Sequence, residues 1–403
     1  MKKLAAILVL FCVLICSCGS TLKDDSTVTS PDTPNAPETV IENDAEQPED
    51  VRLSNLFTNL NLNGEFYIDY VQSPIYNGDR LNFIDFDTMQ TTVVCPKPNC
   101  SHEDPEVCSA FGMSHHPTAY DGKIFFFETL YGDIDENGEA TQSTAIWQAQ
   151  NDGTGRVKLC TVNYSFSDGE TAAITGSKIY FIGSSRSNIS AITESDNCHI
   201  CVFDFAKNEF KDYGELCKGW NANASILGGY NGGLYISASY MTEKFENKVD
   251  YSVSEEDWEK QRELINRENE EREKLTVRSV FRLDLNSGMI EDKGVYDIDN
   301  SLFASGGFCS YTDIETGEHI LYDSEGRFSK IDCELSGNAV NGIVFRMDTL
   351  TAFELSDKRV MKLNASNIGH TDIILAFRNG NYIVKDIINK SYRTVSENEM
   401  FEK

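Results

Sequence analysis

The side chains best suited to binding a metal are clustered in the run Cys-Pro-Lys-Pro-Asn-Cys-Ser-His-Glu-Asp-Pro-Glu-Val-Cys, positions 95–108. This run offers three thiols and one imidazole, at Cys95, Cys100, His102 and Cys108. Three cysteines and one histidine form a common tetrahedral shell for structural Zn²⁺, and the prolines would stiffen the loop that carries them. With all four ligands supplied by the protein, no position would stay open for water, so the predicted zinc site is structural.

Two alternatives to zinc remain open at these four residues. The spacing Cys-x4-Cys-x-His-x5-Cys is not that of a standard zinc finger, and cysteines of exported proteins often pair. A disulfide within the motif, or unpaired thiols, would also fit. Nine cysteines follow Cys18, and this odd number excludes complete pairing within one chain. Cys198 and Cys201 resemble a redox half-site, but strand alternation would place them on opposite faces, which favours a packing role.

Other chemistry is hard to assemble from this sequence. The run 133–138, Asp-Ile-Asp-Glu-Asn-Gly, begins like a calcium loop, but Thr144 stands where an EF-hand needs glutamate, so a hairpin turn is expected. A Gly-x-Ser-x-Gly elbow, a phosphate loop and a His-Glu-x-x-His helix are absent. No catalytic or cofactor-binding residue is therefore predicted, and an enzyme is the less favoured class.

The N-terminus predicts export and lipid attachment. Lys2 and Lys3 precede the apolar run Leu4–Ile15, which is too short to span a bilayer and typical of a signal peptide. The following Cys-Ser-Cys resembles the end of a bacterial lipobox, in which small Ser17 precedes the cysteine that receives the lipid. Residues 1–17 are predicted as the signal peptide and Cys18 as the lipidated residue. An ordinary secretory signal is the alternative.

Residues 18–50 predict a disordered acidic tether, because they are rich in Ser, Thr, Pro, Asp and Glu and poor in large apolar residues. Its root-mean-square reach would be about 30 Å. The formal net charge of −29 argues against nucleic acid and against docking on anionic lipid. Membrane attachment would then depend on the lipid at Cys18 alone, with the outer face of the cytoplasmic membrane as the favoured location.

The rest of the chain is predicted to form short strands. A glycine followed by an aromatic strand recurs seven times, and the first four copies are spaced 54–58 residues apart. The openings start at Gly64, Gly122, Gly176, Gly232, Gly307, Gly342 and Gly380. In the clearest copy, Gly122 is followed by strands expected at Lys123–Phe127, Thr144–Ala149 and Arg156–Cys160, with Gly/Asn/Asp turns between them.

One such sheet cannot bury its own faces, so neighbouring copies must stack. Residues 51–403 are therefore predicted to be an all-β domain, a β-propeller of seven blades, with six or eight blades or two β-sandwiches as alternatives. Residues 254–276 are the exception. They lack glycine and proline and predict a helical insertion in the fourth blade, mostly solvated or, alternatively, binding a partner.

The Asp-Gly-Lys-Ile-Phe-Phe opening at 121–126 and the Ile-Trp-Gln-Ala-Gln-Asn-Asp-Gly-Thr-Gly run at 146–155 resemble repeats of uncharacterised bacterial lipoproteins with TolB-like propellers. The Cys-x4-Cys-x-His-x5-Cys segment is similar to one found in such proteins. The resemblance covers roughly residues 64–395. It implies a propeller fold and an extracytoplasmic address, and it carries no established activity.

The expected function is a non-catalytic binding or scaffolding module whose partner is a protein or glycan of the cell envelope. Two other functions compete with it. One is an enzyme acting on glycans or peptides through carboxylates gathered at the funnel, which would need two carboxylates about 5–9.5 Å apart. The other is a solute-capturing lipoprotein, which would need an apolar or aromatic-lined cavity.

Overall fold

The computed structural model describes residues 51–54, 59–61, 63–72, 77–113, 115–134, 140–166, 171–185, 195–245, 258–294, 302–313, 316–336 and 339–402. All of them belong to one compact unit, Val40–Lys403. The predicted signal peptide 1–17, the lipidated Cys18 and the tether 18–50 lie outside the described residues. Most of the calcium-like run, at 135–138, lies outside them as well.

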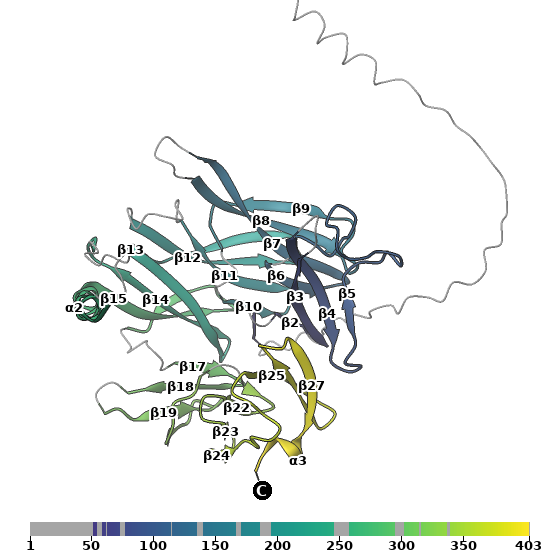
Figure 1. Ribbon diagram of the computed structural model, residues 1–403. Coiled ribbons are helices and arrows are strands. Elements are labelled where there is room, and N and C mark those ends of the chain that lie inside the picture. Colours follow the sequence, from purple (N-terminus) through teal and green to yellow (C-terminus); the bar gives the residue numbers. More distant parts are fainter. Residues whose placement is uncertain are drawn as a thin grey trace, which may run out of the picture. The chain divides into compact units, whose positions relative to one another are not determined.

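The strand group predicted most clearly forms as an antiparallel sheet of four strands (Figure 1). It consists of β6 (His115–Tyr120), β7 (Lys123–Ile134), β8 (Ala140–Gln150) and β9 (Val157–Val162), which pair in chain order. Asp121 and Gly122 join β6 to β7 with φ angles of 48° and 69°. Two consecutive positive φ angles are what a tight hairpin turn demands, and Asp-Gly supplies them at little cost. The turn chemistry of the sequence therefore sets the start of β7.

The other strands within the described residues also fall into consecutive antiparallel groups. The first comprises β1 (Arg52–Ser54), β2 (Asn59–Asn61), β3 (Gly64–Gln72), β4 (Asn77–Asp85) and β5 (Thr91–Val93). The third and fourth comprise β10 (Ala172–Thr175), β11 (Lys178–Ser184), β12 (Ser195–Asp204), β13 (Glu209–Tyr230), β14 (Gly233–Met241), β15 (Thr276–Asp284) and β16 (Ile290–Asp292). β13 pairs with β12 along its first half and with β14 along its second, so it belongs to both groups.

The C-terminal groups are built from shorter strands. The fifth comprises β17 (Phe303–Ser305), β18 (Phe308–Thr312), β19 (His319–Tyr322) and β20 (Phe328–Ile331). The sixth comprises β21 (Ala339–Val340), β22 (Ile343–Arg346), β23 (Thr351–Glu354) and β24 (Arg359–Lys362). The last comprises β25 (Asp372–Arg378), β26 (Asn381–Asp386) and β27 (Ser391–Ser396), followed by the short helix α3 (Glu397–Met400). Each predicted glycine opening lies at the start of β3, β7, β11, β14, β18, β22 or β26, or one or two residues before it.

The predicted helical insertion is confirmed as α2 (Trp258–Leu275), and the first expected residues, 254–257, lie outside the described residues. It lies between β14 and β15, which pair with each other from Met241 and Thr276 onward. The backbone NH of Thr242 donates to the carbonyl of Leu275 at 3.0 Å, so the helix returns the chain to the point where it left the sheet. No helix within the described residues is both long and apolar enough to cross a membrane.

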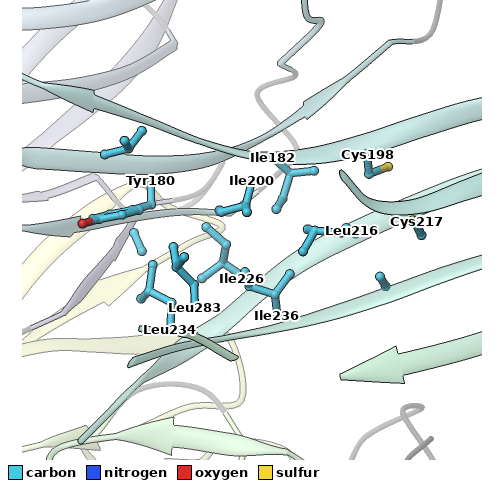
Figure 2. Packing of buried hydrophobic residues seen from close by; sticks show 14 of the residues in the cluster. Tyr180, Ile182, Cys198, Ile200, Leu216, Cys217, Ile226, Leu234, Ile236 and Leu283 are labelled. Atoms are coloured by element: carbon cyan, nitrogen blue, oxygen red, sulfur yellow. The ribbon is translucent and has the colours of Figure 1, made fainter. Parts of the chain in front are cut away.

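Most consecutive groups share a hydrophobic cluster, whereas the fourth and fifth are joined by the parallel pairing of β13 with β17 at Gly228 and Ala304. β3 and β4 pack against β7 through Phe66, Phe83 and Phe126. β7 in turn packs against β11 through Phe127 and Phe181. Figure 2 shows the cluster between the third and fourth groups, where Ile182 and Ile200 lie near Leu234, Ile236 and Leu283. Similar clusters join the fifth group to the sixth and the sixth to the last.

The chain of contacts closes between the first and last groups. Ile84 and Phe86 pack with Leu375 and Ile383 although they lie near opposite ends of the domain. Antiparallel sheets that stack in chain order and close on themselves are a β-propeller, which confirms the predicted fold class. The number of seven blades stays a prediction.

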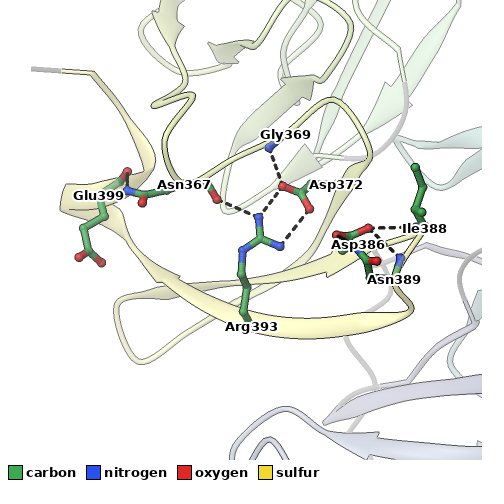
Figure 3. A network of polar contacts seen from close by, with 8 residues as sticks. All are labelled: Asn367, Gly369, Asp372, Asp386, Ile388, Asn389, Arg393 and Glu399. Carbon is green, nitrogen blue, oxygen red and sulfur yellow. Dashed lines mark hydrogen bonds and ion pairs between the residues drawn. The ribbon is translucent and has the colours of Figure 1, made fainter.

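Two ion pairs support the last group. Lys385 Nζ lies 2.7 Å from Glu65 Oε1, and this contact joins β26 to β3. Arg393 of β27 forms a two-pronged contact with the buried carboxylate of Asp372, which also accepts a hydrogen bond from the backbone NH of Gly369 (Figure 3). A further Arg393 hydrogen bond, to the carbonyl of Asn367, holds the preceding loop against the sheet.

Candidate metal centre

The loop between β5 and β6 carries the predicted metal ligands and lies against β4. The backbone NH of Leu81 donates to the carbonyl of Ala110 at 2.8 Å, and the NH of Val94 donates to the carbonyl of Leu81 at 3.1 Å. An isolated bridge between Arg80 and Phe111 continues this contact. Both ends of the loop are thus fixed to the same strand by backbone hydrogen bonds.

Tight turns bring the four side chains together. The NH of Cys100 donates to the carbonyl of Lys97, and the NH of Cys108 donates to the carbonyl of Asp104 at 2.8 Å. Asp104 also accepts a hydrogen bond from the NH of Glu106 through its side chain, the usual way in which aspartate stabilises a turn. His102 itself has a φ of 57°, so its backbone turns sharply and its ring approaches Cys108.

The ligand atoms of Cys95, Cys100, His102 and Cys108 all lie within 4.8 Å of one another. Nδ1 of His102 is 3.4 Å from Sγ of Cys108. In a tetrahedral zinc shell, neighbouring ligand atoms are separated by about 3.5–3.8 Å. The group can therefore hold a metal ion with only small side-chain adjustments, and its donors are those that Zn²⁺ prefers. Within the described part of the chain, it is the only such group of three or more His, Cys, Asp or Glu side chains.

Burial differs among the four ligands in a way that suits a closed site. Cys108 is buried, and the other three are half-buried. The three cysteines pack against an apolar cluster that includes Phe111 and Met113. A metal at their centre would have this apolar cluster on one side and the loop 95–108 on the other.

The electrostatics of the thiols are uneven. Burial raises the pKa of the Cys108 thiol to about 12, and the neighbouring thiols of Cys95 and Cys100 add to this rise. Burial also raises the pKa of Cys95, but backbone hydrogen bonds from Lys97 and Ser109 outweigh it and leave that pKa below its ordinary value. A bound metal ion would instead lower the pKa of the Cys108 thiol, because coordination deprotonates a thiol outright.

The histidine is already in the protonation state that a metal requires. Burial lowers the pKa of His102, and the nearby positive charge of Arg80 lowers it further. Arg80 is held in place by Asp69 at 2.8 Å and donates to the backbone carbonyl of His102 at 3.3 Å. A neutral imidazole can donate its nitrogen lone pair, so His102 can act as a ligand at neutral pH.

Sequence reasoning missed the residues that brace this loop from the next sheet. The guanidinium of Arg156 donates to the backbone carbonyls of Ser109 and Phe111 and, through Nε, to that of Gly153. A Cβ at Gly153 would lie 2.8 Å from the Val94 carbonyl oxygen, so only glycine permits this approach. The signal available in the sequence was the second glycine-rich turn, 151–155, which was interpreted only as a hairpin.

The remaining candidate residues are placed as follows. Cys198 and Cys201 lie on opposite faces of β12, as predicted, because Cys198 packs in the cluster of Ile182 while Cys201 packs in that of Phe181. His199 pairs with Asp212 at 2.9 Å, and the phenol of Tyr164 donates to the same carboxylate at 2.7 Å. No thiol or serine hydroxyl is hydrogen-bonded to this His199 imidazole in the contacts that the structure describes.

No family model matches the sequence, and no curated protein matches it. Among solved structures, the β-propeller domain of the Trilobed protease from Pyrococcus furiosus is 12% identical with a TM-score of 0.38, covering 87% of this chain and 92% of that one. TolB from Acinetobacter baumannii is 11% identical with a TM-score of 0.25, covering 82% and 68%. An oligogalacturonate lyase in complex with manganese is 8% identical with a TM-score of 0.34, covering 86% and 78%. At these TM-scores, the likenesses carry no argument about function.

Proposed function

We propose that this β-propeller is a non-catalytic binding or scaffolding module, held outside the cytoplasmic membrane by a lipid on Cys18. We further propose that Zn²⁺ is bound by Cys95, Cys100, His102 and Cys108. The observation that carries the proposal is the convergence of these four ligand atoms within 4.8 Å. Because the protein supplies all four ligands, the metal would have no open position for a substrate or a reactive water.

The loop 95–108 is exposed to solvent, and a bound metal would order it. Its ligands turn inward, whereas the residues between them, including Lys97, Pro98, Asn99 and Glu103, are exposed. Val107 beside the last ligand is 48% exposed, which makes it one of the larger apolar side chains open to solvent. A metal would fix this exposed loop in one conformation, and a preorganised loop loses less conformational freedom when it binds a partner. The loop is therefore proposed as the binding surface for an envelope protein or glycan.

The metal is tested by elemental analysis of full-length protein purified without chelators, together with a count of free thiols. One equivalent of zinc, lost in Cys100→Ser, is the expected result. Metal-free protein with blocked thiols in this segment would refute the zinc site and support a disulfide in its place. His102→Ala is a second ligand variant that leaves the thiol count unchanged, so the two readouts remain separate.

The binding surface is tested by crosslinking and affinity purification of the intact lipoprotein from its own membranes. Val107→Asp should reduce recovery of a stoichiometric partner while leaving the zinc content unchanged. Val360→Asp is a matched control, since Val360 is 52% exposed and lies on β24, outside the loop. Equal recovery with wild type and both variants would refute the loop as the binding surface.

The membrane anchor is tested independently of both. Cys18→Ser should release the protein from the membrane fraction, while its zinc content stays the same. Membrane association that persists in this variant would refute lipid attachment at Cys18. Glycan-acting enzyme and solute-capture functions remain alternatives, and glycan and small-molecule screens would take priority if no partner is recovered.

A further inference from the structure

Two cysteines that sequence reasoning did not connect lie directly opposite each other on neighbouring strands. Cys198 of β12 and Cys217 of β13 are register partners in the antiparallel ladder. Both side chains are buried, with 2% and 5% of their surfaces exposed. Figure 2 shows the two labelled residues on adjacent strands at one end of the cluster that contains Ile182 and Leu216.

The separation of such a pair suits a disulfide. Residues directly opposite in an antiparallel pair have Cα atoms about 4.5–5.5 Å apart. Disulfides span Cα separations of about 4.4–6.8 Å. The thiol and the backbone NH of Cys198 both lie within hydrogen-bonding reach of the Cys217 sulfur. The two sulfurs therefore face each other within the same space.

The other nearby thiol is excluded by the pleat. Cys201 lies on the opposite face of β12 and packs with Phe181 and Phe203. Its register partner is Asp212 rather than a cysteine. The Cys-x-x-Cys spacing of the sequence is therefore misleading, since Cys198 meets a thiol 19 positions away instead of the one three positions away.

We propose that Cys198 and Cys217 form a cross-strand disulfide in the mature protein. This inference rests on the extracytoplasmic location proposed above, because disulfides persist outside the cytoplasm and are reduced within it. With three thiols assigned to the metal and two to this bond, Cys160, Cys201, Cys309 and Cys333 remain as thiols among the described cysteines. Burial raises the pKa of each of these four thiols, which suits inert packing groups.

The bond forms by two thiol–disulfide exchange steps with an oxidised dithiol oxidoreductase. The Cys217 thiolate attacks one sulfur of that disulfide, forms a mixed disulfide and releases one thiolate of the oxidoreductase. The Cys198 thiol loses its proton and attacks the Cys217 sulfur, which releases the second thiolate. The two cysteines lose two electrons and two protons in total, and the oxidoreductase gains them. Hydrogen bonding from Cys198 holds the pKa of Cys217 below its ordinary value, which favours the Cys217 thiolate.

The position of the bond explains its purpose. β13 leaves β12 and joins β14 at Trp220, which has register partners on both strands. The ladder between β12 and β13 also shifts register directly after Cys198. A disulfide at Cys217 would fasten β13 to the third group three residues before it passes to the fourth, at the point where backbone pairing is least regular.

The test is a peptide map of the full-length chain, expressed with its own N-terminus and alkylated before lysis. Trypsin separates the two cysteines, because Cys198 falls in peptide 187–207 and Cys217 in peptide 212–218. We expect these peptides to be linked without reductant and separate with it. Peptide 187–207 also contains Cys201, so Cys201→Ser should keep the link and Cys198→Ser should abolish it.

The map of the wild-type chain needs no variant, so misfolding of Cys198→Ser would leave the test intact. If both residues are alkylated in the unreduced, denatured chain, either the pair cannot form a bond or the chain was never in an oxidising compartment. Refolding the chain in a glutathione redox buffer separates these two explanations. Formation of the same link there would support the pairing and count against the proposed location. No link in either case, or a link from Cys217 to any other cysteine, would overturn the inference. Membrane fractionation of Cys18→Ser tests the location separately.

Discussion

The ion pair between Lys385 and Glu65 gives the sharpest prediction about stability. The Glu65 side chain is fully buried, and the Lys385 side chain is 12% exposed. Burial raises the pKa of the Glu65 carboxyl, whereas the charge and hydrogen bond of Lys385 lower it. The net pKa stays above the ordinary value of 4.5. Replacing Lys385 by Met keeps the length of the side chain, removes the opposing charge and allows burial to act alone.

The structure sets an upper limit on the loss. Without Lys385, Glu65 enters the folded state as the neutral acid, and protonating a carboxyl of ordinary pKa costs about 3 kcal/mol at pH 7 and about 1 kcal/mol at pH 5. A folded pKa above the unfolded one means that the folded state binds the proton more tightly. Stability is then greatest below pH 4.5 and is lost as pH rises toward the folded pKa. Lys385→Met raises the folded pKa of Glu65 further, so the pH range over which stability falls extends to higher pH.

The assay is urea unfolding at pH 5 and pH 7. We expect Lys385→Met to lower the free energy of unfolding by about 2–3 kcal/mol at pH 7 and by about 1 kcal/mol or less at pH 5. The double variant Glu65→Gln/Lys385→Met should recover much of the lost stability and should show no such pH dependence, since it leaves no buried charge. Lys330→Met is the control, because its partner Glu318 is exposed and such pairs contribute less than about 1 kcal/mol.

A pH-independent loss would refute the reasoning, because it would show that Glu65 stays charged in the folded state of the variant, as it does in the unfolded chain. The neighbouring phenols do not confuse the assay. Burial and the Glu65 charge raise the pKa of Tyr392, and burial raises that of Tyr67, so both stay protonated across this range. Their rings pack 5.5 Å apart beside the carboxyl.

Three further predictions concern the metal site, the Arg393–Asp372 contact and the Cys198–Cys217 pair. Stripping zinc with a chelator should increase proteolysis within residues 95–108 and leave cleavage elsewhere unchanged, and equal cleavage before and after would refute a loop-ordering metal. Arg393→Lys should lower the free energy of unfolding by about 1–3 kcal/mol, because lysine cannot reproduce the two-pronged contact with Asp372, and an unchanged urea midpoint would contradict this. Reduction of the Cys198–Cys217 bond should destabilise the protein by about 3 kcal/mol, from the loop that it closes, and a calorimetric scan with and without reductant measures it.

The local structure could be predicted because it follows from local chemistry. Asp121 and Gly122 favour a hairpin turn, and the unbroken apolar run 124–127 favours a strand that is buried on both faces, one against each neighbouring cluster. The cluster of four candidate ligands was also predictable, since tight turns can bring four donors within fourteen positions together. The helix was predictable because its residues lack both strand alternation and breakers.

What could not be predicted depends on which strands meet. Lys385 and Glu65 are 320 positions apart, and neither residue type nor spacing indicates their contact. The pairing of Cys198 with Cys217 depends on the register of β12 and β13, and a shift by one residue would turn one thiol to the other face. Arg156 was equally hidden, because an arginine that caps backbone carbonyls of a distant loop has no signature of its own in the sequence.

The contacts between strands that are distant in the sequence help to specify the fold, most clearly where the first and last groups meet. Closing a loop of 320 residues costs only about 2–3 kcal/mol more than closing one of 20, since the entropy grows with the logarithm of length. The cluster of Ile84, Phe86, Leu375 and Ile383 can offset that cost by apolar burial alone. A buried ion pair adds little net stability over an apolar pair, but it penalises any other neighbour that would leave Glu65 without a cation. We therefore expect Lys385 to select which sheet closes the propeller more than to hold it closed.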